Sequence, residues 1–194
     1  MIIKRIMDII VSLIGLIVLS PLFLIIFLWI KLTSKGPIIY KHERLGKDHR
    51  VFNVYKFRSM FVGARDMQKE GVSSDKLKTS TGIFIRKAFL DEILQLINVL
   101  KGDMSLVGPR PYDKEDKKKL NIKPGMTGIQ ALYNYLPNKE KDSFIQEHFG
   151  VGKDFDSFYE KNRSFFLDMK IIFYTIIVLI KRMFTRASEI GTRI

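Results

Sequence analysis

The sequence predicts a mostly helical α+β protein that begins with a membrane element. Three observations lead to this fold class. Residues 9–30 carry no charge, two short β-type stretches follow them, and apolar residues recur at helical spacing through much of the remaining chain. We therefore divide the chain into a re-entrant membrane helix over 1–35, a membrane-associated domain over 36–185 and a tail over 186–194.

The charge-free run is long enough to cross a hydrocarbon core of about 30 Å. Ser20 and Pro21 interrupt it near the middle. Proline has no N–H to donate to the Ile17 carbonyl, and its ring crowds that carbonyl, so the helix must bend or break there. We expect the Ser20 hydroxyl to donate back to the Leu16 carbonyl and widen the bend.

Two membrane topologies follow from this break, a kinked spanning helix and a re-entrant helix pair that returns to its starting side. Basic residues flank both ends of the run: Lys4, Arg5, Lys31, Lys35, Lys41 and Arg44. Because positively charged flanks stay in the cytoplasm, this pattern favours the re-entrant form. Asp8 and Trp29 are then expected near the membrane interface.

The stretches Ile38–Glu43 and Val51–Phe57 are predicted to form a small β-hairpin. Residues 55–58 interleave aromatic and basic side chains, which suits a nucleic-acid surface, a phosphate cradle or a lipid-headgroup contact equally well. Ala64–Thr81 is polar and rich in turn residues, so we expect an exposed helix and loop. Ile171–Ile180 is too short to span a bilayer and suits an interfacial amphipathic helix or a core helix.

The charge balance restricts the class of partner. The 194 residues include 33 Lys and Arg against 20 Asp and Glu, a formal net charge of +13. Such an excess indicates an anionic partner, either a nucleic acid, an anionic membrane or a phosphorylated substrate. The absence of cysteine excludes disulfides and thiolate metal sites, and the three scattered histidines argue against a histidine-based zinc site or a Ser-His-Asp triad.

The most informative segment is Lys87–Pro111, in which an acidic pair opens an apolar helical pattern. Asp91, Gln95 and Asn98 form one narrow polar stripe on this helix, as expected for the lining of a pocket. Burying a carboxylate there is costly unless a cation or hydrogen-bond donors meet it. Acidic residues also favour the first turn of any helix, so Asp91 and Glu92 have a structural explanation as well.

Taken in order, a series of motifs resembles the monotopic phosphoglycosyl transferases, the small bacterial sugar transferases that begin polyprenol-linked glycan assembly. The motifs are KRIMDI, the apolar run broken by Ser-Pro, GPIIYKHERLG, YKFRSM, LDEILQLINVLKGDMSLVGPRP, KPGMTG and FYEKNRSFFLDMKII. They cover nearly the whole chain, and the block from LDE to GPRP is the most specific of them.

The resemblance implies transfer of a sugar 1-phosphate from a UDP-sugar to undecaprenyl phosphate with release of UMP. It implies that Asp91 is the nucleophile of a covalent aspartyl-phosphosugar intermediate, and that Glu92 is its catalytic partner and the Mg²⁺ ligand. Ser20 and Pro21 match the family's re-entrant break. The expected location is the bacterial inner (cytoplasmic) membrane, with the catalytic domain on its cytoplasmic face.

Four basic residues in matching motif blocks are candidates to bind the substrate phosphates: Lys56, Arg58, Arg86 and Arg110. Prolines on both sides fix the backbone of Arg110. Each of the four has a plainer alternative, a surface salt bridge or a headgroup contact. Asp168 also matches a family motif, where it either orients a base or caps the last helix.

One segment departs from the family pattern. After the PGMTG turn, whose two glycines let backbone N–H groups approach an anion, the family usually continues Trp-Ala-Gln-Val-Asn-Gly-Arg. Here Ile129–Tyr135 reads IQALYNY, and the segment is one residue short of the family's register. One expected basic contact near the phosphates is lost, and residues 138–153 are a candidate source for a substitute.

The departure keeps a second hypothesis open, that of a catalytically weak, membrane-bound scaffold related to the family. A membrane-tethered nucleic-acid binder is a third, suggested by the charge alone. The leading hypothesis expects a UDP-sugar, undecaprenyl phosphate and a membrane as partners and no nucleic acid. It leaves homo-oligomerisation, the sugar and the glycan pathway open.

Overall fold

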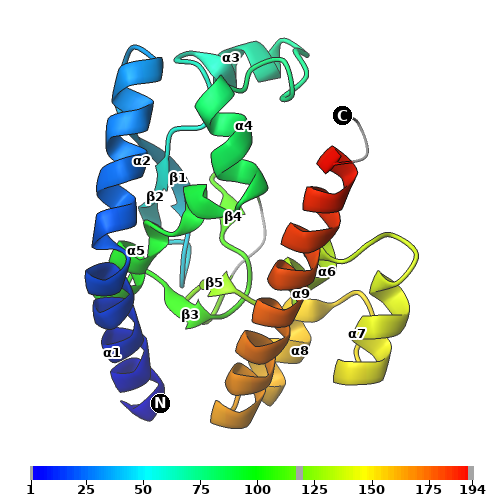
Figure 1. Ribbon diagram of the computed structural model, residues 1–194. Coiled ribbons are helices and arrows are strands. Elements are labelled where there is room, and N and C mark those ends of the chain that lie inside the picture. Colours follow the sequence, from blue (N-terminus) through cyan, green and yellow to red (C-terminus); the bar gives the residue numbers. More distant parts are fainter. Residues whose placement is uncertain (1, 117–119, 192–194) are drawn as a thin grey trace.

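The computed structural model describes residues 2–116 and 120–191 as helices around a small sheet (Figure 1). The N-terminal helices α1 (Ile2–Val18) and α2 (Ser20–Thr33) lie end to end along one edge of the molecule. Helix α9 (Phe165–Gly191) lies on the opposite side of the molecule, and the strands lie between it and the N-terminal helices. The predicted α+β class, mostly helical, is confirmed.

Helices α1 and α2 meet at a bend of 59°. The Ser20 hydroxyl donates to the Ile17 carbonyl at 2.7 Å, so the predicted acceptor, Leu16, is wrong. Ile17 is the carbonyl that Pro21 cannot reach, and the neighbouring serine therefore satisfies the acceptor that the proline leaves open. Among the described residues no single helix is long and apolar enough to cross a bilayer, whereas this bent pair meets both criteria together.

The predicted hairpin is confirmed. Strands β1 (Ile39–Leu45) and β2 (Val51–Phe57) pair antiparallel along their whole length, and the short β4 (Tyr112–Asp113) joins the other edge of β1. This pairing sets Arg44 opposite Asp113. The sheet thereby places side chains of β1, β2 and β4 next to one another, although β4 lies far along the chain.

A second, parallel pair brings two turns together. Strands β3 (Ser105–Val107) and β5 (Gly125–Thr127) align so that the GPRP turn lies beside the PGMTG turn. A Cβ on Gly125 would come within 2.0 Å of the Gly108 nitrogen, so only glycine permits this approach. The Gly125 N–H donates to the Pro109 carbonyl at 2.8 Å. This glycine therefore serves contact between two backbones, not the anion contact considered from the sequence.

The sequence predicted one continuous helix through the acidic segment, and the structure shows that this prediction is wrong. Helix α4 (Ser80–Lys87) ends two residues before Phe89, whose φ of 58° is left-handed, and a 3₁₀ turn, η1 (Leu90–Glu92), follows Phe89. Helix α5 (Gln95–Lys101) begins only after that turn. The burial of the polar stripe is nevertheless confirmed, since Asp91, Gln95 and Asn98 are all buried. Asn98 bonds to the backbone of β2, so only the first two members reach the cavities described below.

The predicted exposed segment contains α3 (Ala64–Lys69) and a loop that leads to α4. Beyond β5 come α6 (Ile129–Tyr135), α7 (Lys141–Phe149) and α8 (Phe155–Asn162), all on the α9 side of the molecule (Figure 1). Of the predicted tail, residues 186–191 continue helix α9, and residues 192–194 lie outside the described residues.

The charged residues of α1 contact the rest of the protein. Arg5 donates to the carbonyls of Val99 and Leu100, at 2.6 and 2.9 Å, at the C-terminal end of α5. A cation suits that end of a helix, where carbonyls lack partners. Asp8 is only 3% exposed and accepts a hydrogen bond from Ser105 Oγ at 2.8 Å. This carboxylate is therefore buried against β3, and its expected position near a membrane interface stays a prediction.

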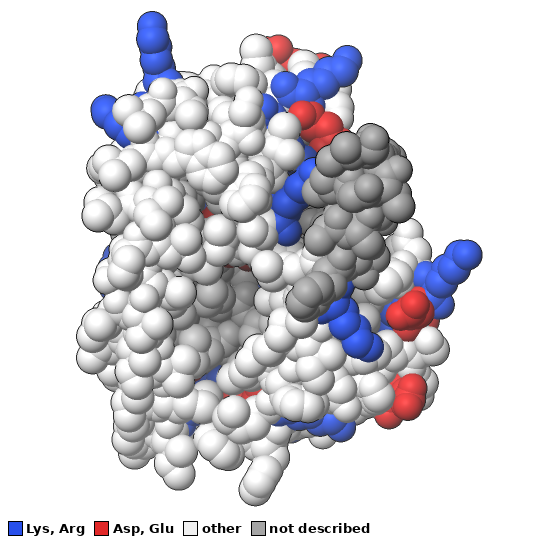
Figure 2. Space-filling model, in the orientation of Figure 1, with Lys and Arg blue, Asp and Glu red and all other residues white. Residues whose placement is uncertain are grey.

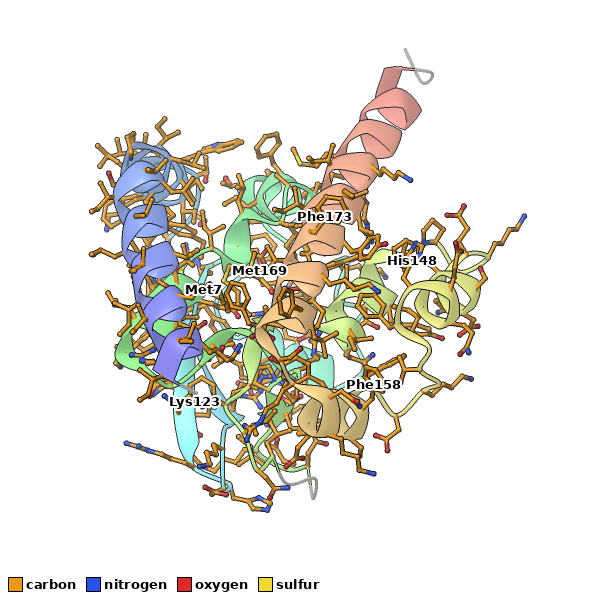
Figure 3. The ribbon with its side chains drawn as sticks, turned by 90° about the horizontal axis from the view of Figure 1, so that it is seen from below. Met7, Lys123, His148, Phe158, Met169 and Phe173 are labelled. Carbon is orange, nitrogen blue, oxygen red and sulfur yellow. The ribbon has the colours of Figure 1, made fainter. Side chains whose placement is uncertain are left out.

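Apolar side chains fill the space between the N-terminal helices and α9. A large core cluster joins α5, β3, α6 and α9, and Met7 of α1 packs against it from the side of its helix that faces α9 (Figure 3). A smaller cluster centres on Ile26 and Ile30 of α2 with Ile85 of α4. Helices α1, α2, α4 and α9 also expose large apolar side chains on their outer sides. The face seen in Figure 2 is largely uncharged, with charged residues mainly around its rim.

Candidate active site

Two adjoining cavities lie between the hairpin, η1 and α6. The larger, here called the cleft, has a volume of about 1170 Å³ and is lined by Asp91 together with Arg58 and Arg86. The smaller, here called the niche, has a volume of about 40 Å³ and is lined partly by the GPRP and PGMTG turns. The residues that line both cavities are Arg44, Lys56, Glu92, Arg110 and Tyr135.

Asp91 lies on η1 with only 8% of its surface exposed. Its Oδ2 atom is 3.7 Å from Nε of Arg86, which itself donates to Ser59 Oγ at 2.8 Å. Burial and the neighbouring Glu92 raise the pKa of Asp91 to about 6, although Lys56 and Arg86 act in the opposite direction. At neutral pH this carboxylate is therefore ionised but poorly solvated, a state that suits a nucleophile.

Glu92 lies beside Asp91, but its pKa is shifted in the opposite direction. Lys56 Nζ is 2.6 Å from Glu92 Oε1, and about a third of the glutamate side chain is exposed. Burial disfavours its charged form, but Lys56, Arg110 and a hydrogen bond from Gln95 outweigh that effect and hold the pKa of Glu92 below its usual value. Two adjacent carboxylates thus titrate apart, as expected of groups with different roles.

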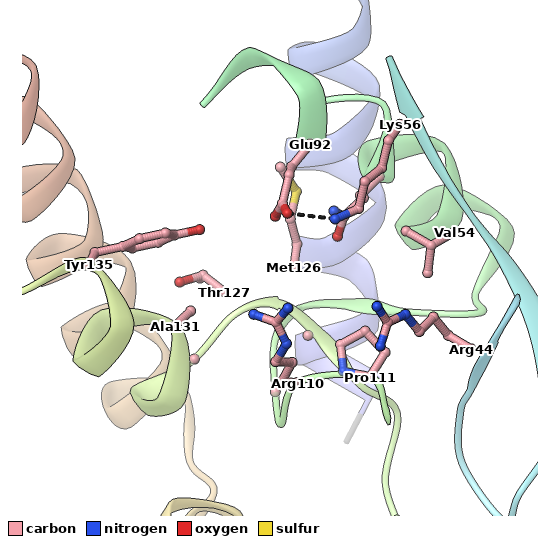
Figure 4. Close-up of a pocket in the computed structure, with 14 residues that line it drawn as sticks. Arg44, Val54, Lys56, Glu92, Arg110, Pro111, Met126, Thr127, Ala131 and Tyr135 are labelled. Atoms are coloured by element: carbon pink, nitrogen blue, oxygen red, sulfur yellow. Dashed lines mark hydrogen bonds and ion pairs between the residues drawn. The ribbon is translucent and has the colours of Figure 1, made fainter. Parts of the chain in front are cut away.

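Arg110 extends into the niche from the turn after β3, opposite the Lys56–Glu92 pair (Figure 4). Arg58 differs from the other basic candidates. It lines the cleft, but its Nη atoms donate to the carbonyl oxygens of Lys35 and Ser34 at 2.7 and 3.0 Å. The Arg58 side chain therefore bonds to the backbone at the C-terminal end of α2, whereas Lys56, Arg86 and Arg110 surround the acidic pair.

Asp168 lies in the first turn of α9 and lines neither cavity. It is 1% exposed, forms an ion pair with Lys4 of α1 at 2.7 Å and accepts a hydrogen bond from Tyr159 Oη at 2.5 Å. Lys4 also donates to the Val107 carbonyl at 3.0 Å. Asp168 is therefore paired with a basic residue of the N-terminal helix and with none of the phosphate-binding candidates, and a role in orienting a site residue stays a prediction.

Two residues that line both cavities, Arg44 and Tyr135, were not predicted from the sequence to belong to the site. Arg44 lies on β1, and its Nη1 atom is 2.7 Å from the Asp113 carboxylate. It stands inside the GPIIYKHERLG motif, where it had been noted only as a flanking charge. Tyr135 ends α6 within the divergent segment, and none of residues 138–153, the proposed substitute source, lines either cavity.

The acidic pair is compatible with Mg²⁺. The described residues contain no cluster of three or more His, Asp or Glu side chains that could hold a metal by themselves. Mg²⁺ is commonly held by one or two carboxylates together with substrate phosphates, and Asp91 and Glu92 supply that number. The partly exposed Glu92 has the more accessible oxygens of the two.

Comparison with known proteins identifies the family of this chain. The profile of the family described as "Bacterial sugar transferase" matches residues 1–182. The "Undecaprenyl-phosphate galactose phosphotransferase" of Salmonella typhimurium is 40% identical, over 92% of this chain and 40% of its own length. The "UDP-glucose:undecaprenyl-phosphate glucose-1-phosphate transferase" of Klebsiella pneumoniae is 37% identical, over 91% of this chain and 40% of its own length.

A shorter relative matches along almost its whole length. The "Exopolysaccharide production protein PSS" of Rhizobium leguminosarum bv. phaseoli is 34% identical, over 91% of this chain and 94% of the relative. The chain spans about two-fifths of the length of the Salmonella and Klebsiella relatives. Because the family profile covers nearly the full sequence, the protein belongs to the bacterial sugar transferase family.

Proposed function

We propose that this protein transfers a sugar 1-phosphate from a UDP-sugar to undecaprenyl phosphate and releases UMP, as an early step of glycoconjugate assembly. The names of the relatives support the substrate classes. The observation that carries the proposal is the environment of Asp91, a buried carboxylate with a raised pKa, Arg86 beside it and a cationic niche next to its cleft.

The proposed reaction has two displacements at one phosphorus. In the first, an Asp91 oxygen bonds to the phosphorus that carries the sugar, the pyrophosphate bond breaks and its electron pair leaves with UMP. In the second, an oxygen of the lipid phosphate bonds to that phosphorus and the bond to Asp91 breaks, which restores the carboxylate. Neither displacement requires a general base, because both attacking oxygens are already anionic.

The basic residues are proposed to neutralise charge around this phosphorus. Arg86, Lys56 and Arg110 approach the acidic pair from three different segments, so the positive charge is arranged before substrate binds. Glu92, with Asp91, is the proposed ligand of Mg²⁺, which when bound would offset the charge of the pyrophosphate. Lys56 fixes the position of Glu92 through their 2.6 Å contact.

The test is UMP release by the detergent-purified protein with undecaprenyl phosphate, Mg²⁺ and a panel of UDP-sugars. We expect release that depends on the lipid and is lost in Asp91→Asn. Asp75→Asn is the matched control, because Asp75 is exposed and lines neither cavity. Full activity in Asp91→Asn would contradict the covalent mechanism, and inactivity of the wild type across the panel would favour the scaffold hypothesis.

We also propose that α1 and α2 form a re-entrant element in the bacterial cytoplasmic membrane, with the cleft on the cytoplasmic side. The bend at Leu19 and the exposed apolar side chains of both helices support this topology. The chain has no cysteine, so single cysteines can be placed at Ile2 and Lys35, which are exposed near the two ends of the pair. A membrane-impermeant maleimide should label both from the cytoplasmic face only. Labelling of the two cysteines from opposite faces would establish a spanning helix instead.

A further inference from the structure

The niche has the size and lining of a site for one phosphate group. A cavity of about 10–15 Å³ on the same measure holds one water, so the niche at about 40 Å³ holds roughly three. Three cations line it, Arg44, Lys56 and Arg110, with Glu92 as the single carboxylate. Among the described residues Arg110 forms no ion pair, so the niche keeps a positive charge that an anion can neutralise.

Arg44 is held in place for such a contact. Its Nη1 atom is 2.7 Å from Asp113, and its side chain is 14% exposed. His42 also lies next to Asp113, but burial and the nearby Arg44 lower the pKa of His42 to about 4, so this imidazole is neutral at physiological pH. Asp113 therefore pairs mainly with Arg44, and the strand pairing of β1 with β4 fixes both partners.

Tyr135 supplies a hydrogen-bond donor on another side of the niche. Its ring extends from the end of α6 with the hydroxyl directed toward Glu92 and Arg110 (Figure 4). Burial and the two carboxylates, Glu92 and Asp91, raise the pKa of Tyr135, so the phenol stays protonated. No group in the described part of the chain forms a hydrogen bond with this hydroxyl, so it is available to a ligand.

Contacts behind Tyr135 fix its orientation. The ring packs edge-on against Phe89, with the centroids 5.1 Å apart. Arg182 of α9 donates to the Tyr135 carbonyl at 3.0 Å, and its guanidinium lies 5.3 Å from the Phe89 ring. The hydroxyl is thus placed by α6, α9 and the residue that precedes η1, and it points into the niche without a partner.

Asp91 lines the cleft and not the niche, whereas Glu92 lines both. A phosphorus attacked by Asp91 therefore lies in the cleft, and the second phosphate of a pyrophosphate is left for the niche. We propose that the niche binds the phosphate that leaves with UMP, and that Tyr135 and Arg44 contact it together with Arg110. This inference rests on the proposed function, because it assigns one part of the donor to one part of that site.

The test compares the binding of UMP with that of uridine by calorimetry, which requires no turnover. We expect Tyr135→Phe to weaken UMP binding about tenfold, because one hydrogen bond to a charged group is lost, and to leave uridine binding unchanged. Arg44→Gln should weaken UMP binding by at least as much. Tyr133→Phe is the matched control, since Tyr133 lies on the same helix and its hydroxyl bonds to Asp142 outside both cavities.

Unchanged UMP affinity in both Tyr135→Phe and Arg44→Gln, each with a wild-type melting temperature, would overturn the inference and leave the proposed reaction intact. A raised KM for undecaprenyl phosphate with unchanged UMP affinity would place the lipid phosphate in the niche and overturn it as well. Failure of the wild type to bind UMP or to release it would instead contradict the proposed function itself.

Discussion

Two lysine–carboxylate pairs of similar geometry lie in different parts of this molecule. In the cleft, Lys56 is 2.6 Å from Glu92, and beneath α1, Lys4 is 2.7 Å from Asp168. The glutamate side chain of the first pair is 34% exposed and lines both cavities, whereas the aspartate of the second is 1% exposed and lines neither. The same chemical pair thus occurs once open to ligand and once enclosed.

The difference lies in what surrounds each carboxylate. Asp168 also accepts from Tyr159, and Lys4 also donates to the Val107 carbonyl, so the enclosed pair is satisfied within the protein. Glu92 faces open space on its cavity side. A satisfied, enclosed pair can fix two helices relative to each other, while an open pair can exchange part of its contacts for a ligand.

The largest expected effect is a loss of protein stability when the enclosed pair is broken. Asp168→Ala removes a buried partner and leaves Lys4 without its counter-charge, which should cost about 3–5 kcal/mol in the free energy of unfolding. Denaturant unfolding in detergent would measure it. If Asp168→Ala unfolded like the wild type, the pair would not hold α1 to α9, and the contrast with the open pair would be lost.

Glu92→Gln should have the converse phenotype. We expect kcat to fall roughly 100-fold, equivalent to about 2.7 kcal/mol in the activation barrier, because the proposed metal ligand loses its charge. The melting temperature should change little, since a partly exposed ion pair contributes about 1 kcal/mol or less. Parallel UMP-release and thermal-melting assays would test both halves. A large loss of stability with unchanged kcat would make this pair structural too.

Asp91→Asn should stabilise the protein at neutral pH while abolishing turnover. The pKa of Asp91 in the folded protein is raised to about 6 from its ordinary value of 3.8, so the folded protein binds the proton more tightly than the unfolded chain does. Wild-type stability therefore falls as the pH rises from about 4 to about 6, and the full penalty persists above that range.

Asparagine carries no such penalty, so the variant should be more stable by about 3 kcal/mol at pH 7.5. The two proteins should differ little near pH 4. Unfolding curves at both pH values measure this difference. Equal stability at pH 7.5 would show that burial of the ionised Asp91 carboxylate costs no free energy. Asp168→Asn should instead destabilise the protein, because the Asp168 carboxylate is paired with Lys4.

The smallest expected effect is at the other end of α1. Ser20→Ala removes the hydrogen bond to the Ile17 carbonyl and should cost about 1 kcal/mol in the free energy of unfolding, with activity retained. Because the enclosed pair still holds the start of α1, the bend should persist. A loss as large as that in Asp168→Ala would mean that the bend, and not the pair, fixes this helix.

The sequence predicted the features that depend on local pattern. The hairpin, the break at Pro21 and the burial of the acidic stripe follow from spacing and from proline geometry, and the structure has them all. The prediction of a continuous helix through Asp91 was wrong because Leu90–Glu92 form a 3₁₀ turn and α5 begins only at Gln95. A helical period alone does not show where a 3₁₀ turn interrupts it.

The niche was beyond such reasoning because tertiary contacts assemble it. Arg44 depends on pairing with a strand that follows some 70 residues later, and Tyr135 on a helix placed by α9. The contacts of Arg58 were beyond it for the same reason. Arg58 lies in a motif that matches the family, but its guanidinium bonds to the backbone at the C-terminal end of α2. Residue type and motif gave candidates, and only the packing decided which of them line the cavities.

The contacts of α1 bear on how this enzyme family can be engineered. Lys4, Arg5 and Asp8 each bond to the body of the protein, at sites on α9, α5 and β3. Helix α1 therefore cannot be exchanged for another apolar helix without loss of these contacts. A chimaera that replaced it with an unrelated hydrophobic helix would leave exposed carbonyls at the end of α5 and an unmatched acid at Asp168. Any design that replaces α1 would need to keep these three side chains.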